Sequence, residues 1–175
     1  MNSARKKLKE ILGRESLTIC PLVYDSLSAH SAGSAGFEIG LIAGSVESMM
    51  VLGAPDIALV TLTELAQIAA QACGASAIPL LVDADHGYGN ALNGACTVKE
   101  LENAGVAGLT IEDYVLPRPF GVSKATLTFI EEWMGKLLSA LDARSDPGLA
   151  IIARTNVTAS SMRPNALRGY PSRDS

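Results

Sequence analysis

The sequence predicts an α/β protein built on a parallel sheet, and three observations lead to this class. Short apolar runs with little polar alternation are separated by longer segments whose apolar residues recur at helical spacing. Such runs are typical of strands that helices cover, as in parallel sheets. The chain has 175 residues, 48% of them hydrophobic and 18% charged, which provides enough apolar surface for one domain with a sizeable core.

The chain begins with a predicted amphipathic helix over residues 1–14. Leu8, Ile11 and Leu12 are at helical spacing among Lys, Arg and Glu, so one face of this helix is apolar. No apolar stretch follows that could serve as a signal peptide. The segment is therefore interpreted as a short helix rather than as a targeting signal.

Predicted strands and helices then alternate along the chain, in the order that defines the α/β class. Each strand is a compact apolar run, and Gly36, Gly74 and Gly105 close the first three helices. The strands are expected at Leu17–Cys20, Phe37–Ala43, Ala77–Val82, Gly108–Ile111 and Leu149–Ala153. The helices are expected at Asp25–Ala35, Leu62–Cys73, Thr97–Ala104 and Phe129–Ala143.

Net charge and cysteine usage exclude several classes of function. The 14 Lys and Arg against 18 Asp and Glu give a net charge of −4, the wrong sign for a broad nucleic-acid-binding surface. Cys20, Cys73 and Cys96 show no CxxC or Cys/His spacing, so we expect free thiols in a reducing cytoplasm. No run approaches the roughly 18 apolar residues of a membrane span. The sequence predicts a soluble, cytoplasmic protein without nucleic-acid or membrane partners.

Polar or small residues directly follow four of the expected strands. Because the carboxyl ends of parallel strands meet at one edge of a sheet, these side chains are expected to converge on an active site. The alternative is that they are helix N-caps and loop residues, a common use of Asp, Ser and Asn. The four groups are Gly44-Ser45, Asp83-Ala84-Asp85, Glu112-Asp113 and Arg154-Thr155-Asn156.

The segment Asp83–Asn90, with the sequence DADHGYGN, is the strongest local signal for chemistry. Asp83 and Asp85 leave the strand end close together, and like charges there repel unless a cation or hydrogen-bond donors occupy the site. Mg²⁺ suits such a site because it takes oxygen ligands and keeps several waters, and Glu112 could complete the acidic ring through water. An Asx-turn followed by a helix N-cap is the structural alternative, and the spacing alone leaves both open.

A resemblance to a known family extends this interpretation. The loop DADHGYGN, TIED at Thr110–Asp113 and ARTN at Ala153–Asn156 resemble the phosphoenolpyruvate mutase/isocitrate lyase superfamily, and within it the bacterial oxaloacetate decarboxylases. The resemblance covers roughly residues 4–156. It implies a (β/α)₈ TIM barrel that binds Mg²⁺ and an α-keto acid and passes through a pyruvate enolate. Further matching segments are Val23–Ser28, Gly44–Val46 and Val51–Thr61.

Taken residue by residue, the resemblance implies a metal site at the aspartate loop. Asp83 matches the direct ligand of Mg²⁺ in the family. Asp85 and Glu112 match carboxylates that hold metal-bound waters. Mg²⁺ is therefore the implied cofactor.

The resemblance also implies a substrate site. Ser45, beside Gly44, matches the residue whose loop backbone holds the substrate carboxylate, and Arg154 matches the arginine that pairs with that carboxylate. Asp56 matches an aspartate near the reacting centre, and Tyr24 is assigned a supporting role in substrate binding. The implied reaction is Mg²⁺-dependent decarboxylation of oxaloacetate to pyruvate and CO₂, in which the metal stabilises the enolate. The chain would then be a carboxy-lyase of pyruvate metabolism that acts on a small α-keto dicarboxylate, in a family expected to be homo-oligomeric.

Residues 114–124, after the fourth strand, argue against other reactions of the superfamily. The resemblance implies that its C–C lyases carry a catalytic Cys in this loop, and that its mutase carries an Asn that holds a phosphoryl group. Neither residue is present here. Oxaloacetate decarboxylation is favoured, and a C–C lyase or another α-keto acid enzyme of the superfamily is the alternative.

The chain is short for a barrel of eight βα units, which usually needs about 250 residues. We expect residues 1–156 to form the N-terminal part of such a barrel, with about five βα units. Residues 157–175, with three Arg and one Asp, are expected to be an irregular or disordered tail. The chain thus resembles a C-terminally truncated family member, and a second hypothesis is that it has lost activity and is not an enzyme.

Overall fold

A computed structural model describes residues 2–117, 120–121 and 126–155 of the chain. Within them, a five-stranded sheet has the order β1-β2-β3-β4-β5, and every neighbouring pair of strands is parallel. Strands that follow one another in space as they do in sequence form the wall of a (β/α)₈ barrel. The predicted α/β class and incomplete barrel are therefore confirmed. The strands are β1 (Leu22–Val23), β2 (Gly40–Ile42), β3 (Leu80–Asp83), β4 (Gly108–Glu112) and β5 (Ala150–Arg154).

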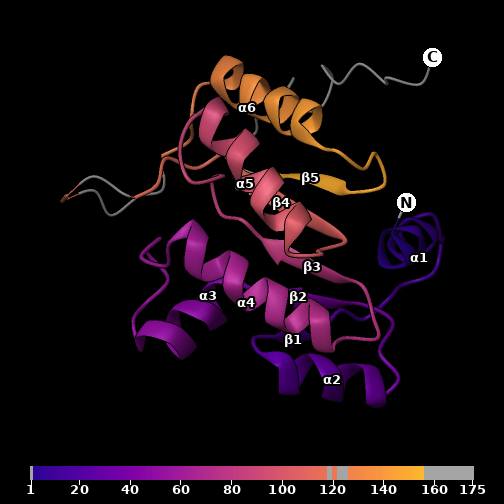
Figure 1. Ribbon diagram of the computed structural model, residues 1–175. Helices are drawn as coiled ribbons and strands as arrows, with labels where there is room; N and C mark the ends of the chain where they lie inside the picture. The colour runs from indigo at the N-terminus through magenta and orange to yellow at the C-terminus, as the bar shows by residue number, and fades with distance from the viewer. Residues whose placement is uncertain (1, 118–119, 122–125, 156–175) are drawn as a thin grey trace.

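Four helices cover one face of this sheet. Figure 1 shows α2, α4, α5 and α6 side by side on that face, with α1 and α3 at opposite ends of the strands. The core between helices and sheet includes Leu65, Val82, Leu109 and Trp133, all with almost no solvent exposure. Burial of each such aliphatic side chain contributes about 1.5–3 kcal/mol. The helices are α1 (Ser3–Leu12), α2 (Ser26–Ser34), α3 (Gly44–Glu47), a π-helix η1 (Ser48–Leu52), α4 (Leu62–Ala75), α5 (Ala91–Asn103) and α6 (Ile130–Ala143).

The alternation of side chains along the strands decides which residues are available for chemistry. Val82 and Ile111 are fully buried against the helical layer. Successive side chains of a strand point to opposite faces, so their neighbours Asp83 and Glu112 point to the other, inner face. Arg154 of β5 lies in register with Glu112 and shares this face. The inner face of the sheet therefore ends in charged side chains.

The first predicted strand, at Leu17–Cys20, was placed wrongly. Leu17 is 95% exposed, and β1 begins only after Pro21. The carbonyl of Pro21 accepts a hydrogen bond from the backbone N–H of Leu41, and Leu22 lies opposite Leu41 in the parallel ladder. The pairing partner, rather than local hydrophobicity, sets the position of this strand.

Two helical segments also differ from the sequence-based expectation. Helix α5 begins at Ala91 rather than Thr97, because Asn90 and Asn93 form a reciprocal capping box at its N-terminus. The segment α3–η1, after β2, was not predicted. The expected tail at residues 157–175 lies outside the described residues.

Candidate active site

Three charged side chains and one hydroxyl meet at the carboxyl ends of β3, β4 and β5. Nη1 of Arg154 lies 2.9 Å from Oδ2 of Asp83 and 2.6 Å from Oε1 of Glu112. Thr110 Oγ1 donates a hydrogen bond of 2.9 Å to Oδ1 of Asp83. The strand register causes this meeting, because Asp83 lies opposite Thr110 and Glu112 lies opposite Arg154. Residues up to 71 positions apart in the sequence thus form one cluster.

The loop after β3 bends sharply at Asp85, which has a backbone φ of 45°. An L-residue rarely adopts this left-handed conformation, and such strained residues cluster at functional sites. The N–H of Asp85 donates to Oδ1 of Asp83 at 3.3 Å, which is the predicted Asx-type turn. The carbonyl of Asp85 accepts a 2.7 Å hydrogen bond from the N–H of Glu112. The Asx-type turn is therefore present, and its hydrogen bonds connect Asp85 with Asp83 and Glu112. The turn and an acidic site are thus compatible.

Gly44, at the end of β2, brings a further strand end to the same place. A Cβ atom at this position would lie 3.4 Å from Oδ1 of Asp85 and 3.8 Å from Oδ1 of Asp56. The carboxylates of Asp56 and Asp85 therefore both reach the start of α3. The structure thus brings together the predicted residues Gly44, Asp56, Asp83, Asp85 and Glu112, with Arg154 beside them.

The other two predicted substrate-binding residues follow β2 and β1 at the same edge of the sheet. Ser45 is an exposed residue in the short helix α3, directly after Gly44. Tyr24 follows β1, the strand at the edge of the sheet, and lines a cavity with Asp25, Leu27 and Phe37. Asp25 is the N-cap of α2, where its side chain accepts a hydrogen bond from the N–H of Ser28. N-capping is the structural alternative that the sequence analysis gave for polar residues after strands.

The electrostatics of the cluster oppose further negative charge. Burial raises the pKa of Asp85 to about 7, and the neighbouring charges of Asp83, Asp56 and Glu112 raise it too, while Arg154 lowers it. Burial also raises the pKa of Glu47 to about 8, with contributions from Asp85 and Asp83. An additional cation would therefore relieve repulsion here.

The donor set fits a hard divalent cation. Carboxylates are the ligands that Mg²⁺ prefers, and Mg²⁺ usually uses only one or two of them together with waters and substrate. In the part of the chain that the structure describes, no three His, Cys, Asp or Glu side chains form a closed ligand group.

The aspartate loop is supported from the helical side by Lys136. This residue of α6 is almost fully buried, and its Nζ donates a 2.7 Å hydrogen bond to the carbonyl of His86. Thr97 Oγ1 donates to the carbonyl of Gly87 at 3.2 Å. A Cβ atom on Gly94 would lie only 3.1 Å from Cγ of Lys136, so glycine leaves room for the lysine. These contacts hold the aspartate loop from the side of α5 and α6.

Sequence reasoning missed Glu47 and Thr110. Glu47 is the only charged residue between Glu38 and Asp56, an apolar stretch in which a lone acid is conspicuous. Thr110 is a polar residue among the apolar residues of β4, two positions before Glu112. Both signals were available, but neither shows by itself that the side chain points to the inner face.

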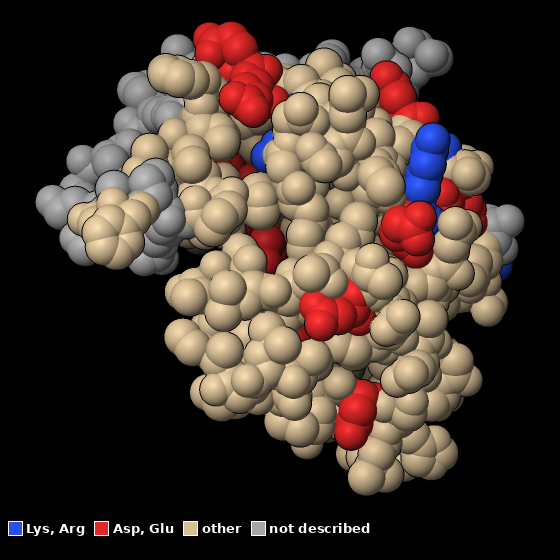
Figure 2. All heavy atoms as spheres, turned by 60° about the vertical axis from the view of Figure 1, so that its left-hand side comes forward, with Lys and Arg blue, Asp and Glu red and all other residues tan. Residues whose placement is uncertain are grey.

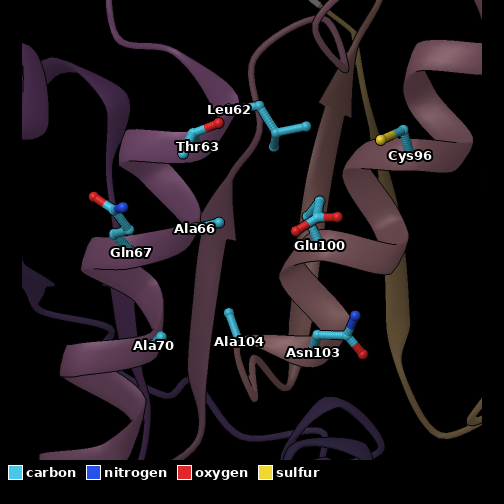
Figure 3. A pocket seen from close by; sticks show the side chains of 9 residues that line it. All are labelled: Leu62, Thr63, Ala66, Gln67, Ala70, Cys96, Glu100, Asn103 and Ala104. Atoms are coloured by element: carbon cyan, nitrogen blue, oxygen red, sulfur yellow. The ribbon is translucent and has the colours of Figure 1, made fainter.

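Grooves elsewhere on the surface have a different character. One of about 430 Å³ lies between α4 and α5 and is lined by Leu62, Ala66, Cys96 and Glu100 among others. Figure 3 shows these side chains on α4 and α5, in the outer helical layer. On the face drawn in Figure 2, acidic side chains outnumber basic ones, in agreement with the negative net charge.

Most of the chain matches a known protein family. The sequence model described as phosphoenolpyruvate phosphomutase matches residues 8–169. The chain belongs to the phosphoenolpyruvate phosphomutase family. The resemblance inferred from the sequence motifs is thereby confirmed. No helix within the described residues of this family member is long and apolar enough to cross a membrane.

Two similar sequences of the family carry the same name. Oxaloacetate decarboxylase of Rhodopseudomonas palustris (strain BisB18) is 53% identical over 157 residues, which are 90% of this chain and 54% of the relative. Oxaloacetate decarboxylase of Pseudomonas fluorescens (strain SBW25) is 49% identical over 155 residues, 89% of this chain and 54% of the relative. The chain thus spans about half the length of the relatives that it matches.

Two solved structures of similar fold were obtained with ligands. Oxaloacetate acetylhydrolase in complex with the inhibitor 3,3-difluorooxalacetate superposes with a TM-score of 0.80 at 31% identity, over 87% of this chain and 54% of that one. Phosphonopyruvate hydrolase in complex with oxalate and Mg²⁺ has a TM-score of 0.85 at 27% identity, over 95% of this chain and 58% of that one.

Proposed function

We propose that the chain catalyses the Mg²⁺-dependent decarboxylation of oxaloacetate to pyruvate and CO₂. The observation that carries the proposal is the convergence of Asp83, Glu112 and Arg154 at one edge of the sheet, with Asp85 and Asp56 beside them. The cluster thus offers an acidic site for a cation and an arginine for a carboxylate. Similarity to sequences named oxaloacetate decarboxylase supports the choice of reaction.

Each residue of the cluster has a role in this proposal. Asp83, Asp85 and Glu112 would hold Mg²⁺, which when bound acts as a Lewis acid on the keto group of the substrate. The side chain of Arg154 is 47% exposed, so its guanidinium is accessible to a substrate carboxylate and can orient it by paired hydrogen bonds. Gly44 and Ser45 supply the backbone next to that carboxylate, and Tyr24 supports binding from the end of β1.

Asp56 is assigned to the reacting centre. Its Oδ1 lies close to the position that a Cβ on Gly44 would take, beside Asp85, so it reaches the site although its own loop is exposed. A carboxylate placed there repels the negative charge of a bound β-carboxylate, which favours its departure as neutral CO₂. Lys136 and Thr97 contribute by holding the loop that carries Asp85.

The test is the formation of pyruvate from oxaloacetate by the purified chain with Mg²⁺. Free Mg²⁺ also decarboxylates oxaloacetate, so each rate is compared with the same solution without protein. We expect a rate clearly above this blank, at least 100-fold lower in Asp83→Asn and unchanged in Glu38→Gln, an exposed carboxylate far from the site. Equal rates for the wild type, Asp83→Asn and the blank would support the alternative hypothesis of an inactive chain.

The same assay addresses a second reaction of the same substrate. Oxaloacetate acetylhydrolase, whose solved structures resemble this chain, would cleave oxaloacetate to oxalate and acetate, as its name and its complex with oxalate indicate. Measuring oxalate beside pyruvate separates the two reactions. We expect pyruvate without oxalate.

Homo-oligomerisation and a cytoplasmic location belong to the same proposal. The first rests on the family resemblance. The second rests on the sparse set of Cys20, Cys73 and Cys96, which lack CxxC or Cys/His spacing.

A further inference from the structure

Glu47, the last residue of α3, is the most unusual buried acid in the described part of the chain. It is only 2% exposed, and its Oε1 has no hydrogen-bond partner there. Burying a carboxyl oxygen without a hydrogen-bond partner is unfavourable, so such atoms are rare and each one calls for an explanation. Its retention within an otherwise apolar segment requires an explanation.

The local backbone explains why Glu47 faces inward. Helix α3 begins directly at the end of β2, and the N–H of Glu47 donates a 3.0 Å hydrogen bond to the carbonyl of Ala43. Glu47 therefore lies one helical turn above the strand end. Glu47 and Ser48 are buried, whereas Met49 and Met50 are exposed, so the inward position holds the charged residue and the outward ones hold apolar residues. This is the reverse of ordinary amphipathic patterning.

The buried Glu47 side chain lies within electrostatic reach of the acidic cluster of Asp83 and Asp85. The charges of Asp85 and Asp83 both act on Glu47, and those of Asp85, Glu47 and Asp83 all act on Tyr88 of the aspartate loop. Gly44, in the same short helix, lies against the aspartate loop, because a Cβ atom there would be 3.4 Å from Oδ1 of Asp85. Helix α3 therefore places the buried Glu47 beside the cluster, on the side of β2. The sequence analysis did not include it among the site residues.

The cationic side chains described near the cluster are engaged with other partners. Arg154 binds Asp83 and Glu112, and Lys136 donates to the carbonyl of His86. A water-coordinated divalent cation between the loop and α3 would supply the hydrogen-bond donors that Glu47 Oε1 requires. Carboxylates in the outer shell of a metal site commonly accept hydrogen bonds from such waters.

We propose that Glu47 is a further holder of the divalent cation, accepting hydrogen bonds from metal-bound waters on the α3 side of Asp83 and Asp85. This inference rests on the metal site of the proposed function, but not on the reaction. It assigns the α3 segment to cation binding, in addition to its place beside the substrate carboxylate. The cation would then be held by carboxylates at the ends of three strands: Glu47 after β2, Asp83 and Asp85 at β3, and Glu112 at β4.

The test is the binding of Mn²⁺ alone, without substrate, measured as the loss of the free-ion electron paramagnetic resonance signal. The variant is Glu47→Gln, which keeps the shape of the side chain and removes its charge. We expect its Kd for Mn²⁺ to rise 10–100-fold, the range typical for loss of an outer-shell partner. Glu38→Gln is the matched control, since Glu38 is exposed and pairs with Arg14, and its Kd is expected to stay that of the wild type.

A second readout separates cation binding from a structural role. In EDTA at pH 8, where the buried carboxylate is uncompensated, Glu47→Gln should unfold at a urea concentration equal to or higher than that of the wild type. A lower midpoint together with unchanged Mn²⁺ affinity would show a purely structural role and overturn the inference. If the wild type binds Mn²⁺ more tightly than Glu47→Gln but does not decarboxylate oxaloacetate, only the proposed reaction fails. If the wild type does not bind Mn²⁺, both proposals fail.

Discussion

The two ends of the sheet use the same kinds of side chain for opposite purposes. At the amino ends of the strands, Arg5 of α1 is buried and contacts Asp146 at 3.0 Å and Glu102 at 3.4 Å. It also donates to the backbone carbonyls of Val106 and Glu102. At the carboxyl ends, Arg154 contacts two carboxylates through one nitrogen atom, and its side chain is half exposed.

The pKa values of the two clusters differ in the same way. Hydrogen bonds from the backbone N–H groups of Gly148 and Asn2, together with one from Arg5, lower the pKa of Asp146 to about 2. At the other end, burial and like charges raise the pKa of Asp85 to about 7. The acids at the amino end are paired within the protein, whereas at the carboxyl end the single positive charge of Arg154 is outnumbered by the carboxylates around it. The difference in charge balance suits the amino-end cluster to stabilising the fold and the carboxyl-end cluster to the cation binding that we propose.

The largest effect on stability is expected from breaking the cluster at the amino end. Arg5→Met removes the partner of two acids, Glu102 and Asp146, and leaves their charges partly buried. Loss of one member of a buried ion pair costs about 3–5 kcal/mol. Urea denaturation should therefore show a large fall in the free energy of unfolding.

The matched control for this prediction is Arg14→Met, which removes an ion pair with Glu38 that is exposed on both sides. Exposed pairs contribute little, so the midpoint should stay near that of the wild type. Equal midpoints for Arg5→Met and the wild type would show that the cluster at the amino end does not stabilise the fold.

The second prediction concerns the pH dependence of stability without metal. The folded pKa of Asp85 is raised from 3.8 to about 7 and that of Glu47 from 4.5 to about 8. The unfolded chain then releases these protons at lower pH than the folded chain, so the free energy of unfolding falls as pH rises from about 4 to about 8. Asp146 has the opposite sign: its stabilisation is present above its ordinary value of 3.8 and is lost as pH falls towards 2.

Urea denaturation in EDTA at a series of pH values measures this dependence. Asp85→Asn should make the decline between pH 4 and pH 8 smaller, with the part due to Glu47 remaining, whereas Glu38→Gln should leave it nearly unchanged. A stability that is constant across this range in the wild type would contradict the electrostatic description of the carboxyl end.

Much of this comparison could be predicted from the sequence, because it depends on regular features of parallel sheets. Asp83, Glu112 and Arg154 directly end apolar runs, so topology alone brings them together once the strands are recognised. The pairing of Glu112 with Arg154 follows from the register. The spacing of Asp83 and Asp85 left Mg²⁺ and an Asx-turn both open, and oxaloacetate came only from the family resemblance.

Other parts depended on tertiary structure and could not be predicted. The inward direction of Glu47 depends on where α3 leaves β2, and that segment has no clear helical period. The left-handed backbone of Asp85 is set by hydrogen bonds to Asp83 and Glu112. β1 starts after Pro21 because β2 provides its hydrogen-bonding partner there. In each case a distant contact overrides the local pattern.

The central claim, that the carboxyl end binds a divalent cation and the amino end does not, is tested most directly by the effect of Mg²⁺ on unfolding. Binding to the folded state alone raises the free energy of unfolding by about 2.7 kcal/mol at 100 times the Kd. We expect Mg²⁺ to stabilise the wild type and Arg5→Met by similar amounts at the same Mg²⁺ concentration, and to have no effect on Asp83→Asn. Equal stabilisation of the wild type and Asp83→Asn by Mg²⁺ would contradict the claim.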